Sequence, residues 1–149
     1  VLEVDQVTGK ERSQNTWWVR SAGKAVGSRW VDGERQRAVG EGFCWGLNEG
    51  YTLNGDGRMA NSSLLDYRMA TSLDLPMINT IIVEVANPGH PYGVRGVGEV
   101  PIVPPMAAIA NAIARATGVR MEHLPMSPGA MLEAMWAEGG EPAGLQAAD

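Results

Sequence analysis

One carboxylate in this sequence stands in a setting that suits chemistry. Glu99 ends a loop in which Gly93, Gly96 and Gly98 allow positive φ angles and a close approach of the backbone to a bound group. An apolar segment with few backbone N–H donors, residues 100–105 (VPIVPP), follows directly. We therefore expect Glu99 to lie at the boundary between solvent and a dry interior, where desolvation makes a carboxylate more basic and fits it for general base catalysis.

The same residues fit an ordinary tight turn that leads into a buried helix and leaves Glu99 solvated. A phosphate cradle in a small nucleotide-binding module is a further alternative. The loop lacks the lysine of a Walker phosphate loop, and it does not follow a clear strand as a dinucleotide fingerprint does. Nucleotide titration would test this second alternative directly.

Composition narrows the classes of function. A net charge of -5 without a basic run argues against a nucleic-acid partner. No stretch approaches the roughly 20 apolar residues of a membrane span, and no signal-peptide pattern opens the chain, so we expect a cytoplasmic protein. The single Cys44 excludes an internal disulfide and an iron–sulfur cluster held by this chain alone. With only His90 and His123, a metal site within the chain is not expected.

The periodicity predicts an α+β fold in which a mixed sheet packs against helices. Strands are expected at 1–5 and at 16–20, where Trp17 and Trp18 point to opposite faces. Asn-Gly and Asp-Gly pairs predict a hairpin over 51–59. The β-branched run 80–85 predicts a strand that is buried on both faces.

A helix is predicted over 30–51, capped by Asp32, with an apolar stripe in its second half. Each glycine inside it costs up to roughly 1 kcal/mol relative to alanine, so we expect these positions to approach another backbone or a ligand closely. They are Gly33, Gly40, Gly42 and Gly46. Cys44, in the same helix, has no basic neighbour in sequence and is expected to be a small buried side chain.

Two further helices are expected toward the C-terminus. One follows the prolines, carries apolar residues at helical spacing over 106–117 and ends at Gly118. The other begins at Ser127-Pro128 and ends near Gly139. We expect one domain over 1–138 and a disordered tail over 139–149.

The order and spacing of these motifs resemble a known family. The motifs are the D-x-x-T-G turn at 5–9, the glycine-bearing helix from Gly33, the turn at 54–57, Asp66-Tyr67, the strand at 80–85 and the G-x-G-E loop at 96–99. Together they are similar to the C-terminal part of the large, molybdopterin-binding subunit of the xanthine dehydrogenase and aldehyde oxidoreductase family, the molybdenum hydroxylases. The resemblance covers nearly the whole chain.

The resemblance implies a mechanism and a set of cofactors. Glu99 would be the base beside the molybdenum, while Gly96, Val97 and Gly98, with Gly33 and Glu34, would contact the cofactor. The cofactor would be molybdenum-molybdopterin in its cytosine dinucleotide form, shared with a larger molybdopterin-binding partner chain. Two-iron (2Fe-2S) clusters and FAD would lie on other subunits, so the chain would be active only with its partners.

The sequence departs from the family pattern near the expected cofactor. Ser21 and Gly27-Ser28 stand where the family has an aspartate and an asparagine-proline, and Arg37-Ala38 replaces a paired glycine. Glu34 and Glu41 each replace a glutamine, and an ionised glutamate accepts hydrogen bonds but cannot donate them. These departures leave open a non-catalytic structural subunit with a vestigial glutamate.

The family implies a water-derived hydroxylation of an aldehyde, a purine or an N-heterocycle. The carbon monoxide branch is less favoured, because its cysteine loop is absent and Glu99 is followed by Val-Pro. The chain is expected to be a small subunit or a split C-terminal segment of such an enzyme. A cut piece of one large subunit is the remaining alternative.

Overall fold

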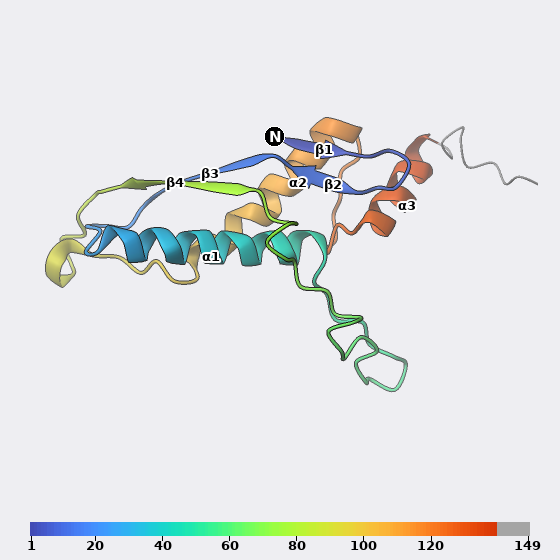
Figure 1. The fold of residues 1–149 in the computed structure, drawn as a ribbon, viewed down its shortest axis with the longest axis horizontal. Helices are drawn as coiled ribbons and strands as arrows, with labels where there is room; N and C mark the ends of the chain where they lie inside the picture. Colours follow the sequence, from blue (N-terminus) through green and yellow to red (C-terminus); the bar gives the residue numbers. More distant parts are fainter. Residues whose placement is uncertain (140–149) are drawn as a thin grey trace, which may run out of the picture.

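The computed structural model describes residues 1–139 of the 149-residue chain. The strands of this part are β1 (Leu2–Val4), β2 (Glu11–Ser13), β3 (Asn15–Ser21) and β4 (Met77–Val83). The α-helices are α1 (Ser28–Leu47), α2 (Val103–Thr117) and α3 (Pro128–Gly139), and the short 3-10 helices are η1 (Pro91–Gly93) and η2 (Val100–Ile102). The predicted α+β fold is confirmed (Figure 1). The expected tail lies outside the described residues, except for Gly139, which ends α3.

The opening hairpin forms as predicted. β1 and β2 pair antiparallel, with Val4 opposite Glu11. Asp5 closes the turn, because its Oδ1 accepts hydrogen bonds from the backbone N–H groups of Val7 at 2.8 Å and Thr8 at 3.0 Å. These bonds stabilise the ionised carboxylate, with Thr8 contributing most, and lower the pKa of Asp5.

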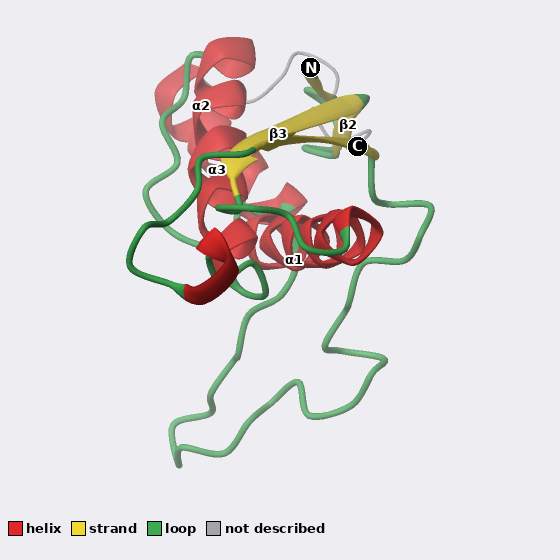
Figure 2. Ribbon diagram, turned by 90° about the vertical axis from the view of Figure 1, so that its left-hand side faces the viewer, coloured by secondary structure: helices red, strands yellow, loops and turns green. Residues whose placement is uncertain are grey.

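The second sheet consists of β3 and β4, which pair parallel. Trp18 points to the helices and is buried, whereas Trp17 is 66% exposed, so the predicted opposite orientation of the two tryptophans is confirmed. The prediction that the strand over 80–85 is buried on both faces is wrong for this chain, since Ile81 and Val83 are 44% and 40% exposed. The reason is that α1 lies on only one side of this two-stranded sheet (Figure 2).

Helix α1 is the longest element and lies between β3 and β4 in the chain. It ends at Leu47, a turn earlier than predicted. The expected cap is also wrong: the N-cap residue is Gly27, which has φ 82° and makes no side-chain cap bond, so Asp32 lies inside the helix. The apolar stripe is confirmed by Val39 and Phe43, which are buried.

Close packing explains three of the four helical glycines. A Cβ on Gly42 would lie 2.5 Å from the carbonyl oxygen of Ile102, and one on Gly46 would lie 3.0 Å from Cδ1 of Ile109. A Cβ on Gly40 would meet Leu75 at 3.3 Å. The backbones of α1 and of the η2–α2 segment therefore approach closely. Gly33 approaches no other backbone, because no described residue lies within 4 Å of its Cβ position.

The core lies where α2 and the start of α3 meet α1 and the inner face of the sheet. Its residues are Trp18, Val39, Phe43, Ile109, Ile113, Met126 and Met131. Gly118, which has φ 83°, caps the C-terminus of α2, and α3 starts after Ser127, as the sequence predicts. Cys44 is buried, as expected, and this burial raises the pKa of its thiol. Within residues 1–139, no helix is both long and apolar enough to cross a membrane.

Residues 48–76 project from this body as a long connection (Figure 1). The predicted hairpin over 51–59 is reduced to one antiparallel bridge between Leu53 and Met59 around a turn. In that turn the N–H of Gly57 donates to the carbonyl of Asn54 at 2.9 Å. Because the two arms make no further ladder, no strand forms there.

The two glycines that differ most in their surroundings give a matched test of the α1 packing. Gly42→Ala should lower the free energy of unfolding by about 1–3 kcal/mol, because the new methyl group forces the Ile102 carbonyl away. Gly33→Ala should instead raise it by roughly 0.5–1 kcal/mol, since helix propensity improves in open space. Urea unfolding measures both; equal effects would contradict the close approach of α1 to η2.

Candidate functional site

Glu99 lies between the glycine loop and η2. Its carbonyl accepts a hydrogen bond from the N–H of Ile102 at 3.3 Å, and the following Pro101 is buried. The Glu99 side chain itself is 70% exposed. The expected dry environment is therefore not formed by the described residues, because the chain turns inward only after Glu99 and the carboxylate extends to the exposed face of α1.

The side chain of Arg37 forms hydrogen bonds with several of the candidate residues. Its Nη2 donates to Oε1 of Glu99 at 2.9 Å and to the carbonyl oxygen of Gly98 at 3.3 Å. Its Nε donates to Glu34 at 3.0 Å, and its Nη1 donates to Glu41 at 2.6 Å. The hydrogen bond to Glu99 is the largest cause that raises the pKa of Arg37, followed by that to Glu34. Two predicted site residues far apart in sequence, Glu34 and Glu99, thus share one guanidinium.

The start of the loop is fixed to the end of β3. The N–H of Arg95 donates to the carbonyl of Ala22 at 2.9 Å, and that of Lys24 donates to the carbonyl of Gly93 at 2.8 Å. Gly23 has φ +68°, and a Cβ there would lie 2.3 Å from the Gly93 carbonyl oxygen. Only glycine fits at position 23, where the end of β3 crosses the backbone of Gly93.

The glycines of the loop differ from the sequence-based expectation. Gly93 has a positive φ of 67°, as does its neighbour Tyr92 at 60°, whereas Gly96 and Gly98 do not adopt positive φ. Nothing lies within 4 Å of a Cβ built on either Gly96 or Gly98. Among the described residues, the N–H groups of Gly96, Val97 and Gly98 find no acceptor. These donors remain available to a bound group in open space.

The roles of Arg35, Arg37 and Glu41 were not predicted from the sequence. The spacing of Glu34, Arg37 and Glu41 is typical of ion pairs on one helix face and could have been recognised. The pair of Arg37 with Glu99, 62 positions away, has no local signal. Arg35 is buried and donates to the carbonyls of Arg20 at 2.7 Å and Ile81 at 3.2 Å, so it ties α1 to both strands of the sheet.

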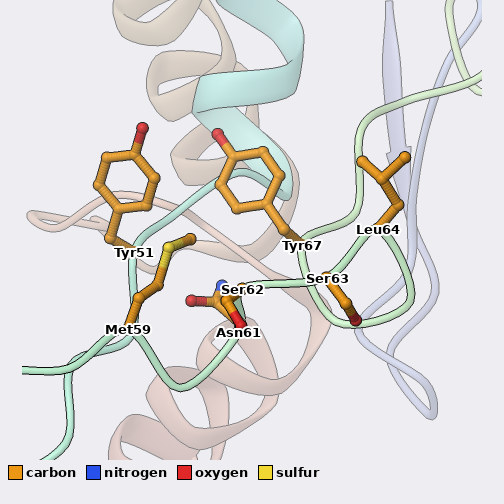
Figure 3. A pocket seen from close by; sticks show the side chains of 7 residues that line it. All are labelled: Tyr51, Met59, Asn61, Ser62, Ser63, Leu64 and Tyr67. Carbon is orange, nitrogen blue, oxygen red and sulfur yellow. The ribbon is translucent and has the colours of Figure 1, made fainter.

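A small hollow of about 300 Å³ lies elsewhere, on the projecting segment 48–76 (Figure 3). Tyr51 and Tyr67 line it, with ring centroids 5.7 Å apart. The hydroxyl of Tyr67 donates to Glu49 at 2.7 Å, and this bond raises the pKa of Tyr67 to about 12. The hollow contains none of the predicted site residues. Within residues 1–139, no group of three or more His, Cys, Asp or Glu side chains could hold a metal ion.

Comparison with known proteins agrees with this fold. The model of the molybdopterin cofactor-binding domain family matches residues 1–76. A putative xanthine dehydrogenase molybdenum-binding subunit of Escherichia coli K12 is 36% identical over 116 residues, which cover 77% of this chain and 15% of the relative. An aldehyde oxidoreductase of Megalodesulfovibrio gigas is 30% identical over 137 residues, covering 91% of this chain and 15% of the relative.

Solved structures give the same result. The aldehyde oxidoreductase from Desulfovibrio desulfuricans superposes with a TM-score of 0.81 and 32% identity, covering 89% of this chain and 14% of that chain. The fold and these matches define a part of a molybdopterin-binding domain. The chain belongs to the xanthine dehydrogenase and aldehyde oxidoreductase family of molybdenum hydroxylases. It spans about 15% of the length of the relatives it matches.

The crossing at Gly23 can be tested against Gly57, which has a similar positive φ of 79° but open space around its Cβ position. Gly23→Ala should lower the hydrogen-exchange protection of the Lys24 and Arg95 amides by about tenfold or more, the equivalent of ~1.4 kcal/mol. Gly57→Ala should leave both amides unchanged, because it adds strain without a clash at the loop. Unchanged protection in Gly23→Ala would show that the crossing does not hold the loop.

Proposed function

We propose that this chain supplies the active-site base, Glu99, of a molybdenum hydroxylase, as a small subunit or split C-terminal segment of the enzyme. The observation that carries the proposal is that Glu99 and Glu34 share the guanidinium of Arg37, beside backbone amides at 96–98 that have no acceptor among the described residues. A carboxylate beside free N–H donors suits proton transfer next to an anionic or oxo-bearing group.

The residues present fit the molybdopterin cofactor in two respects. Three consecutive N–H groups, those of Gly96, Val97 and Gly98, could donate hydrogen bonds to it, and the glycines leave room for its approach. Gly33 and Glu34 lie in the second turn of α1, with open space around Gly33, and Glu34 would accept a hydrogen bond from the pterin there. When bound, the molybdenum cofactor would supply the oxidation of a substrate carbon with oxygen derived from water.

The task of Glu99 would be to take a proton in that reaction. Its Oε1 is engaged by Arg37, whereas its Oε2 accepts no hydrogen bond from the described residues. The exposed carboxylate would become desolvated only when a partner chain and substrate cover it. General base catalysis of this kind contributes roughly 10²–10⁴-fold to a rate.

We further propose that a larger molybdopterin-binding chain holds most of the cofactor, in its cytosine dinucleotide form. Two-iron (2Fe-2S) clusters would lie on another subunit, because Cys44 is the one cysteine of this chain and is buried. FAD would also lie on another subunit. Relatives include a 6-hydroxypseudooxynicotine dehydrogenase complex subunit gamma and a nicotine 6-hydroxylase large subunit, whose names describe multi-subunit enzymes. The substrate class is an aldehyde, a purine or an N-heterocycle, and the proposed location is the cytoplasm.

The outer face of the β3–β4 sheet is the proposed contact with that larger chain. Trp17 and Val19 on β3 and Ile81 and Val83 on β4 form an exposed apolar row. Parallel sheets normally have both faces covered, and exposed apolar patches mark interaction surfaces.

A non-catalytic structural subunit is the second candidate. The ion pair between Arg37 and Glu99 favours it, because the guanidinium already occupies one oxygen of the carboxylate. The two functions differ in the need for Glu99 during turnover.

Glu99→Gln separates these two functions in the assembled complex. If Glu99 is the base, kcat should fall by about 10²–10⁴-fold while the complex still forms, because an amide cannot accept the proton. Glu122→Gln, at an exposed position between α2 and α3, is the control and should keep normal turnover. Normal turnover in Glu99→Gln would instead identify the glutamate as vestigial.

Val19→Glu tests the docking face, since a charge on this face opposes burial against another chain. Co-purification with the larger molybdopterin-binding chain should be lost, while circular dichroism of the isolated variant stays unchanged. The matched control is Val7→Glu in the turn after β1, because the two valines are similarly exposed, at 58% and 60%. A complex that survives Val19→Glu would place the contact elsewhere.

A further inference from the structure

The attachment of the loop segment 96–99 depends on a single side chain. Before this segment, the last backbone hydrogen bond to another part of the chain runs from the N–H of Arg95 to the carbonyl of Ala22. After it, the next backbone bond is the one inside η2, from the N–H of Ile102 to Glu99. Between them, among the described residues, the hydrogen bonds that fasten this segment to another element both come from Arg37.

The guanidinium of Arg37 is itself held in orientation. Glu34, three positions before it, and Glu41, four positions after it, bind its Nε and Nη1 from the same helix. These two bonds fix the plane of the group and direct Nη2 toward the loop, where it meets both the side chain of Glu99 and the carbonyl of Gly98. Arginine suits this task, because its rigid fork can serve several acceptors at once.

Solvent exposure limits what these ion pairs contribute to stability. The side chains of Arg37 and its carboxylate partners are 41–70% exposed, and exposed pairs stabilise a fold little. The effect of the cluster is therefore on geometry. Within the described residues, it makes the hydrogen bonds that join segment 96–99 to a helix.

We propose that Arg37 is a positioning residue that holds the Glu99 carboxylate and the Gly98 carbonyl against α1, leaving Oε2 of Glu99 free to take a proton. The proposal rests on the role of Glu99 proposed above. Glu34 and Glu41 orient Arg37, so three departures from the family pattern, at positions 34, 37 and 41, act as one unit. Misplacement of a reacting group by about 1 Å can cost on the order of 10²-fold in rate.

The first measurement is independent of catalysis. Backbone ¹⁵N relaxation of the 149-residue chain gives order parameters for residues 96–99. They should be about 0.85 in the unaltered chain and fall below about 0.6 in Arg37→Ala, because the loop loses its hydrogen bonds to Arg37. Arg29→Ala is the matched control: this arginine is exposed on the same helix and forms no ion pair within the described residues, so the loop should stay ordered. Order parameters unchanged in Arg37→Ala would overturn the proposal.

The second measurement uses the assembled complex. Arg37→Ala should lower kcat by about 10–100-fold with KM changed less than about threefold, as expected when a reacting group is misplaced. Arg37→Lys should recover part of the loss, because an ammonium group can hold Glu99 but cannot serve Glu34 and Glu41 together with it. A rise of kcat in Arg37→Ala would overturn the proposal, since Arg37 would then restrain the base.

Together the two measurements separate this proposal from the role of Glu99. If Glu99→Gln abolishes turnover while Arg37→Ala changes neither the order parameters nor kcat, the positioning role is wrong and the base stands. If the loop loosens in Arg37→Ala but Glu99→Gln and Arg37→Ala both turn over normally, the base assignment is wrong. In that case Arg37 still holds the loop, but neither Arg37 nor Glu99 has a role in catalysis.

Discussion

The ion cluster around Arg37 is the interaction on which the candidate site depends. It joins helix α1 to the loop that carries Glu99, two segments separated by 62 positions in sequence. Without it, the loop segment 96–99 has no bond to another element within the described residues. The cluster is exposed and stabilises the fold little, yet it determines where the carboxylate lies.

Close backbone packing brings α1 near the loop that carries Glu99, so that Arg37 can reach it. Gly42 lets the carbonyl of Ile102 approach α1, and Gly23 lets the carbonyl of Gly93 cross the end of β3. Arg35 adds a third restraint, because its buried guanidinium binds carbonyls on both strands of the sheet. Rigid elements thus flank the loop that carries Glu99 on both sides, and within the described residues Arg37 makes the hydrogen bonds that hold segment 96–99 between them.

Local patterns predicted most of the secondary structure. Proline, glycine and apolar spacing identified β3, α2 and α3, and Asp5 identified the first turn, because these signals act within a few residues. The predicted cap of α1 was wrong, and the hairpin over 51–59 forms only as one antiparallel bridge around its turn. The burial of β4 could not be predicted either, because it depends on which elements cover the sheet.

The site was predictable only in part. The glycine loop and the family resemblance brought attention to Glu99 and Glu34, and the structure brings both to one guanidinium. Arg37 stood out only as a departure from the family pattern, because a contact between positions 37 and 99 leaves no periodic signal in sequence. The exposure of Glu99 also could not be predicted, since a loop before a buried proline can direct its side chain either way.

The role of Glu99 is tested most directly by a structure of the assembled complex with the molybdenum cofactor bound. We expect Oε2 of Glu99 to lie within hydrogen-bond reach, about 2.6–3.2 Å, of the cofactor, while Oε1 remains bound to Arg37. A molybdenum centre far from Glu99, or a Glu99 side chain turned away from it, would contradict the assignment of this residue as the base.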